Sequence, residues 1–199
     1  MKKAAFILLS VVAFGPSLAQ QTVFGVKGGM NISNLQYSDQ SSTNKRIGLH
    51  LGILAQIHAA AKWAIEPEFF YSLEGNSAIL IPQGTVYTKL NYLAIPVLVQ
   101  YLLNSGFRLE SGPQIAYLLS ASTKQRATRL TDSHFQSTAI SLPLGVGYQG
   151  TSGFGLDARY CFGLTNINNG RQPIIQGIVL QLGAFYSFSV ARARRTRKQ

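Results

Sequence analysis

The most constraining feature of this chain is a period-two alternation of apolar and polar residues that recurs along its length. Such alternation is typical of β-strands with one apolar and one polar face. It predicts eight strands, at residues 22–33, 47–59, 63–73, 90–103, 107–119, 138–148, 154–165 and 177–189. The gaps between them alternate between long and short, which is typical of barrels with loops at one end and tight turns at the other. The sequence therefore predicts an all-β fold, an eight-stranded antiparallel up-and-down transmembrane β-barrel of the smallest class.

The first residues have the composition of an export signal. A Met-Lys-Lys start, an apolar run to Phe14 and a small-x-Ala site that ends at Ala19 make up the expected pattern. No later segment offers about 20 unbroken apolar residues, so a helical membrane protein is excluded and only a closed barrel could span a bilayer. We expect a signal peptide (1–19), a barrel domain (20–190) and a basic C-terminal tail (191–199).

Charged residues on the polar faces decide which faces meet lipid. Within the predicted strands these are Lys27, Glu66, Glu68, Arg108, Glu110, Asp157 and Arg159. An Arg or Lys that faced lipid at the bilayer midplane would cost about 2–4 kcal/mol. Several such costs would exceed the total stability of a typical domain, about 5–15 kcal/mol. We therefore expect the apolar faces to point outward and the charged residues to form a paired network that fills the lumen. The alternative is a narrow path for ions or protons.

A second set of cations lies in or near the predicted long gaps at 34–46, 74–88, 120–135 and 166–176. These residues are Lys45, Arg46, Lys89, Lys124, Arg126, Arg129 and Arg171. One interpretation is that these cations only keep the loops solvated. The functional alternative is that they hold lipopolysaccharide phosphates through charge-assisted hydrogen bonds.

The chain is basic overall, with 18 Lys and Arg against 7 Asp and Glu. A basic chain can indicate nucleic-acid binding, but here the basic residues are not interleaved with aromatic residues on one face. We therefore expect outer-membrane lipid and lipopolysaccharide as partners, together with envelope proteins, and no nucleic acid.

The residue types that carry catalysis or bind metals are present without a suitable arrangement. His134 and Ser137 differ in parity, so on one strand they would point to opposite faces. His50 and His58 share a face but lack further metal ligands, and they fit a polar lumen better. Cys161 is the single cysteine and cannot form an internal disulfide. We expect no catalytic residue, no metal site and no cofactor.

Several short motifs occur in a fixed order. They are Gly25-Val-Lys-Gly-Gly-Met-Asn-Ile-Ser33, Glu66-Pro-Glu-Phe-Phe-Tyr71, Tyr92-Leu-Ala-Ile-Pro-Val-Leu98, Gly112-Pro-Gln114 and Arg159-Tyr-Cys-Phe-Gly-Leu-Thr-Asn-Ile167. In this order the chain resembles the PorT-like outer-membrane β-barrel family of Bacteroidetes-type bacteria, over nearly all of its length after the predicted signal peptide. The resemblance implies an eight-stranded barrel in the outer membrane, and some relatives are linked to secretion and gliding machinery.

Taken together, these features predict a monomeric, non-enzymatic barrel in the bacterial outer membrane. Its role would be structural or interactive, in envelope or secretion-related assemblies. Both termini lie on the side of the short turns, which for an exported barrel is the periplasm. A narrow channel for small solutes or ions is the alternative function, and an outer-membrane enzyme is a weaker one.

Overall fold

The computed structural model describes residues 22–37, 43–80, 84–125, 128–130, 136–167 and 175–188, so the predicted signal peptide and basic tail lie outside the described residues. Most of the described residues belong to strands. The strands are β1 (Thr22–Tyr37), β2 (Thr43–Ala60), β3 (Trp63–Leu80), β4 (Gly84–Leu102), β5 (Phe107–Ser111), β6 (Gln114–Gln125), β7 (Thr128–Leu130), β8 (Thr138–Gln149), β9 (Phe154–Gly163) and β10 (Ile175–Ser187).

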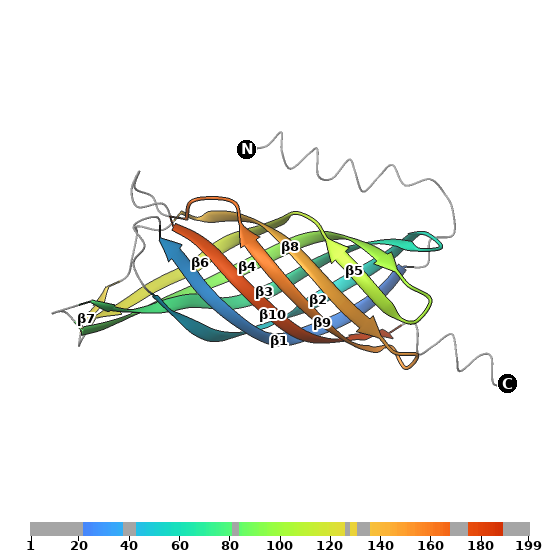
Figure 1. Cartoon of the computed structure of the whole chain (residues 1–199), viewed down its shortest axis with the longest axis horizontal. Helices are drawn as coiled ribbons and strands as arrows, with labels where there is room; N and C mark the ends of the chain where they lie inside the picture. Colours follow the sequence, from blue (N-terminus) through green and yellow to red (C-terminus); the bar gives the residue numbers. More distant parts are fainter. Residues whose placement is uncertain are drawn as a thin grey trace.

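These segments make one closed antiparallel barrel (Figure 1). β1 pairs with β2 on one side and with β10 on the other, so the first and last strands close the sheet. β5 and β6 act as one strand that is interrupted at Gly112 and Pro113, because both pair with β4 on one side and β8 on the other. β7 pairs with β6 and extends it as a short hairpin. The described residues thus form eight barrel strands, and the predicted fold class is confirmed.

The two ends of the barrel differ in their connections. At one end, here called the turn end, tight turns at residues 61–62, 103–106 and 150–153 join the strands, and β1 begins and β10 ends there. The opposite end, here called the hairpin end, carries the extensions of β3, β4, β6 and β7 (Figure 1).

The prediction of long loops at the hairpin end was wrong for much of their length. β3 and β4 stay paired out to Leu80 and Gly84, and β6 pairs with β7 out to Gln125 and Thr128. The sequence of these extensions mixes polar residues with apolar ones such as Ile79, Leu80 and Val86, and it lacks the regular apolar alternation that marks a lipid-facing strand. The hydrogen bonds between paired strands join main-chain N–H and C=O groups, and every residue except proline has both groups. Strand pairing therefore does not require apolar side chains. The strands therefore continue as paired hairpins beyond the apolar belt.

The outer surface of the barrel is apolar, as the alternation predicts. Leu51, near the middle of β2, is 70% exposed, and Ile53 is 59% exposed, whereas His50 and Leu54 on the inner face are 3% exposed. Near the turn end, outward aromatic rings pack in pairs across neighbouring strands, such as Trp63 and Tyr101 with ring centroids 5.0 Å apart. Aromatic girdles of this kind are enriched where a membrane meets water.

No helix among the described residues is long and apolar enough to cross a membrane.

Candidate functional site in the barrel lumen

All the charged residues predicted for the lumen lie there, and every one of them is buried. They come from β1, β3, β5 and β9, on which residues two apart share the inner face. They are Lys27, Glu66, Glu68, Arg108, Glu110, Asp157 and Arg159. The barrel wall thus gathers these groups, which lie far apart in sequence, into one enclosed space.

Arg159 is the centre of this network. Its Nη1 and Nη2 atoms donate to the two carboxylate oxygens of Glu68, each at 2.6 Å, which makes a bidentate pair. Its Nε donates to Glu110, and its Nη2 lies 3.6 Å from Oε1 of Glu66. Because β9 and β3 are not neighbours in the sheet, the pair with Glu68 spans the lumen. The guanidinium of Arg159 therefore links two opposite sides of the barrel wall through hydrogen bonds.

Lys27 forms ion pairs with two acids, Asp157 and Glu68, and shares both of them with Arg159. Its Nζ lies 3.0 Å from Oδ1 of Asp157 and 3.6 Å from Oε1 of Glu68. Gly183 faces this pair, and a Cβ there would lie 2.9 Å from Oδ1 of Asp157 and 3.0 Å from Cε of Lys27. The absence of a side chain at this position leaves room for the ion pair.

Arg108 completes the network near the turn end. Its Nη1 lies 3.5 Å from Oε2 of Glu66, and its Nε lies 3.3 Å from Oε2 of Glu110. Its guanidinium also stacks on Phe185, 4.2 Å from the ring centroid, in a cation–π contact. A Cβ at Gly147 would lie 2.7 Å from Arg108 Nε, so this glycine also makes space for a long charged side chain. Pairing with opposite charges offsets the high cost of burying these groups.

A chain of hydrogen bonds continues from β2 toward the hairpin end. Nδ1 of His50 lies 2.8 Å from Oδ1 of Asn31, which can only accept, so the imidazole is the donor. Asn31 Nδ2 donates to Ser72 Oγ at 2.8 Å, and Ser72 Oγ donates to Glu74 Oε1 at 2.8 Å. The alternation pattern did not identify Glu74, because this residue follows the predicted strand and was expected in a loop. Glu74 lies two residues after Ser72, and this spacing could have placed both side chains on the same inner face.

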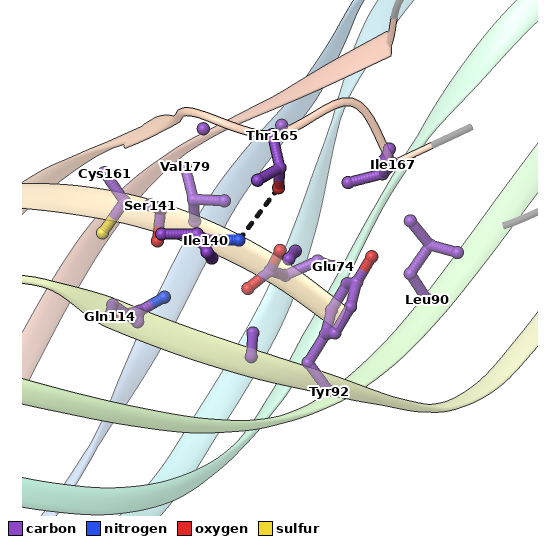
Figure 2. Close-up of a pocket in the computed structure, with 14 residues that line it drawn as sticks. Glu74, Leu90, Tyr92, Gln114, Ile140, Ser141, Cys161, Thr165, Ile167 and Val179 are labelled. Carbon is purple, nitrogen blue, oxygen red and sulfur yellow. Dashed lines mark hydrogen bonds between the residues drawn. The ribbon is translucent and has the colours of Figure 1, made fainter. Parts of the chain in front are cut away.

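A small cavity of about 40 Å³ lies beside Glu74 (Figure 2). Its polar lining includes Glu74, Tyr92, Gln114, Ser141 and Thr165. The cavity is far smaller than the roughly 300–1,000 Å³ of sites that hold small organic ligands. It has room for an ion or a few water molecules.

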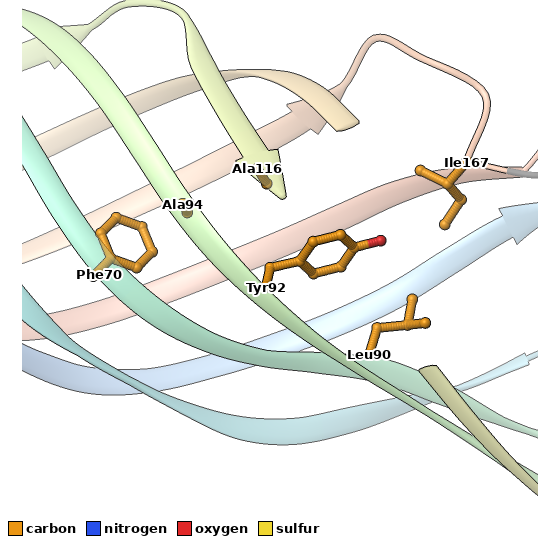
Figure 3. Close-up of a cluster of buried hydrophobic side chains, with 6 residues drawn as sticks. All are labelled: Phe70, Leu90, Tyr92, Ala94, Ala116 and Ile167. Carbon is orange, nitrogen blue, oxygen red and sulfur yellow. The ribbon is translucent and has the colours of Figure 1, made fainter. Parts of the chain in front are cut away.

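An apolar cluster borders this cavity inside the barrel (Figure 3). Its members are Phe70, Leu90, Tyr92, Ala94, Ala116 and Ile167. The alternation pattern predicted a polar lumen, so this apolar cluster was not expected. Residues 90–98 are largely apolar on both faces, so alternation gave no sign that the inner face would pack into an apolar cluster.

The cations predicted to contact lipopolysaccharide lie on the hairpin end where the structure describes them. Lys45 and Lys89 are exposed. Arg46 is half-buried and donates from Nη1 to the main-chain oxygen of Glu74. Lys124 and Arg129 are placed by their backbone, opposite each other on β6 and β7, and Arg126 and Arg171 lie outside the described residues.

The other candidate groups of the sequence do not converge in the described part of the chain. Within it, no group of three or more His, Cys, Asp or Glu side chains could hold a metal ion. His134 lies outside the described residues, so its relation to Ser137 is not defined. Cys161 is buried on the inner face of β9.

Comparisons with known proteins agree with this architecture. Neisserial surface protein A matches with a TM-score of 0.57 and 14% identity, over 83% of this chain and 97% of that chain. Ail, the attachment invasion locus protein of Yersinia pestis, matches with a TM-score of 0.53 and 15% identity, over 84% of this chain and 99% of that chain. A second Ail structure, in complex with the heparin analogue sucrose octasulfate, matches with a TM-score of 0.54 and 13% identity, over 84% and 99% of the two chains.

At these identities the structural matches show the fold alone. A search of curated proteins found no significant match. The profile of the family described as "Outer membrane protein beta-barrel domain" matches residues 18–169, which is most of the chain. The chain therefore belongs to the outer membrane protein beta-barrel domain family and is a barrel of the bacterial outer membrane.

Proposed function

We propose that this protein is a non-enzymatic outer-membrane barrel that is closed to solutes and acts as a structural or interaction component of the cell surface. The observation that carries the proposal is the ion-pair network centred on Arg159. Its bidentate bond to Glu68 crosses the lumen, and the acids and bases around it are buried and in contact. A barrel of eight strands is just wide enough for side chains to fill its interior. Such a lumen supports the barrel wall and leaves no continuous path for water.

A conductance measurement tests the closed lumen. We expect purified protein inserted into planar bilayers to show no steady current, because an ion would have to displace paired side chains that span the lumen. A porin inserted into the same bilayers serves as the positive control. A reproducible open-channel current from the folded barrel would support the channel alternative and contradict a closed lumen.

The hairpin end is the proposed interaction surface. Lys45 and Lys89 are exposed there, and Lys124 and Arg129 follow on the paired backbone of β6 and β7. The acidic residue described at this end, Glu74, lies beside the inner cavity. Lys45 and Lys89 thus present positive charge to solvent at this end, which suits lipopolysaccharide phosphates or other polyanionic saccharides. The structure of Yersinia pestis Ail with a heparin analogue supports this proposal, since it shows a barrel of this fold in complex with a polyanionic saccharide.

Binding of lipopolysaccharide to the barrel in lipid nanodiscs tests this surface. We expect the double variant Lys45→Gln/Lys89→Gln to bind more than about tenfold more weakly, because each lysine near an anionic surface contributes about 1 kcal/mol. The difference should shrink at high salt. Lys62→Gln, an exposed lysine in a turn at the opposite end, is the matched control and should bind as the wild type does. Equal losses in both variants would count against a specific role of the hairpin end.

The orientation and the finer family assignment belong to the same proposal. The hairpin end would face the outside of the cell and the turn end the periplasm, so that both termini are periplasmic and the barrel acts as a monomer. Membership in the PorT-like branch, and with it a role in secretion-related assemblies, is supported by the ordered motifs described above.

A further inference from the structure

We propose that the small cavity beside Glu74 binds one small monovalent cation, of the class of sodium, potassium or ammonium. The cavity lies in the lumen, is lined by residues of β3, β4, β6, β8, β9 and β10, and lies on the hairpin side of the charge network (Figure 2). Neither the family assignment nor the proposed surface role calls for such a site. The inference rests on the groups that line the cavity.

The first observation is a carboxylate whose charge is not balanced nearby. The hydrogen-bond chain from His50 through Asn31 and Ser72 ends on Glu74 Oε1, so every bond in the chain donates toward this carboxylate. Among the residues that the structure describes, no basic side chain forms an ion pair with it. Arg46 approaches the same residue, but its Nη1 donates to the main-chain oxygen rather than to the carboxylate. Glu74 is partly buried, and an anion withdrawn from water is costly without a counter-charge.

The second, independent observation concerns the side-chain amide of Gln114, whose oxygen is a hydrogen-bond acceptor. Gln114 is only 4% exposed and lines the same cavity, and its Oε1 has no hydrogen-bond partner among the described residues. Buried side-chain oxygens are nearly always satisfied. The Glu74 carboxylate and the Gln114 amide both line this cavity, and a bound cation would accept electron density from a carboxylate and from an amide oxygen alike.

The size and charge of the site indicate the kind of cation. Ser141, Thr165 and Tyr92 add hydroxyl oxygens to the lining, and hard cations prefer oxygen ligands. A volume of about 40 Å³ admits an ion with one or two waters and excludes larger organic cations. One carboxylate and one monovalent cation are neutral together. A divalent ion would leave a positive charge beside apolar side chains such as Leu90 and Val179.

Thermal unfolding of the folded barrel in detergent micelles tests the site. Sodium or potassium chloride replaces N-methyl-D-glucamine chloride at constant ionic strength, and the heat-modifiable band shift on gels reports the unfolding midpoint. We expect the wild-type midpoint to rise and saturate as the small cation replaces the bulky one, because a ligand of the folded state stabilises it. Glu74→Gln should abolish this rise. A flat wild-type profile, or a rise that persists in Glu74→Gln, would overturn the proposal.

Matched variants separate the site from general effects of salt. Gln114→Met should weaken the apparent affinity about tenfold, because it removes one oxygen ligand and keeps the volume. Gln181→Met is the control, since the Gln181 amide is also buried without a hydrogen bond to any described residue but does not line this cavity. Its response should equal that of the wild type. Sodium NMR relaxation gives a direct readout that needs no variant at Glu74: wild-type protein should broaden the sodium signal, and Gln114→Met should reduce the broadening. Equal broadening by both proteins would contradict the site.

Discussion

Replacing Arg159 by methionine is expected to lower the free energy of unfolding by about 3–5 kcal/mol, the cost of removing one partner from a buried ion pair. The change would leave Glu68 and Glu110 buried without their main cation. Methionine fills part of the volume, so the loss reports the uncompensated charges more than a cavity. Urea titration of the barrel in lipid vesicles, followed by tryptophan fluorescence, measures the effect.

Two further variants identify the cause of this loss. Arg159→Lys keeps the positive charge but cannot form the bidentate pair with Glu68, so we expect an intermediate loss. Lys89→Met removes an exposed cation at the hairpin end and should change stability by less than about 0.5 kcal/mol. If Arg159→Met cost no more than Lys89→Met, the lumen network would not support the barrel.

The second large effect is expected on the outer surface. Leu51→Arg should destabilise the inserted barrel by about 2–4 kcal/mol, because Leu51 projects outward near the middle of β2, where lipid would surround a guanidinium. The same titration in vesicles measures this variant.

The cost of an outward arginine should depend on its depth in the membrane. Leu103→Arg, at an exposed position in a turn at the end of the barrel, should cost about 0–1 kcal/mol because the charge can reach the interface. Equal costs at Leu51 and Leu103 would mean that the middle of the barrel is not surrounded by hydrocarbon.

Alternation of side chains predicts both of these positions from the sequence. Leu51 and Arg159 each lie on a strand whose period is unbroken, so parity assigns the leucine to the outside and the arginine to the inside. The energetic cost of charge in lipid then decides which face is which. The tight turns and the order of the barrel strands follow from the same pattern.

Other features depend on information that a strand pattern does not contain. One such feature is the choice of acid that pairs with Arg159. It depends on the register and tilt of strands that are not neighbours in the sheet, because Arg159 lies on β9 and its partner Glu68 lies on β3. The apolar cluster around Tyr92 was not expected, because β4 is largely apolar on both faces and its alternation does not distinguish a polar lumen from an apolar one. Glu74 was missed because polar strand extensions resemble loops in composition, although their backbones are paired.

The central claim, that apolar side chains face lipid while the opposite faces fill the lumen, is tested most directly at two adjacent phenylalanines. Phe69 is 47% exposed on the outside of β3, and Phe70 is 1% exposed on the inside. Phe69→Trp and Phe70→Trp, each made in a Trp63→Phe background, place a single tryptophan on either face at almost the same depth. Phospholipids with brominated acyl chains quench tryptophan on contact. The account predicts strong quenching for Phe69→Trp and weak quenching for Phe70→Trp; equal quenching, or the reverse order, would contradict it.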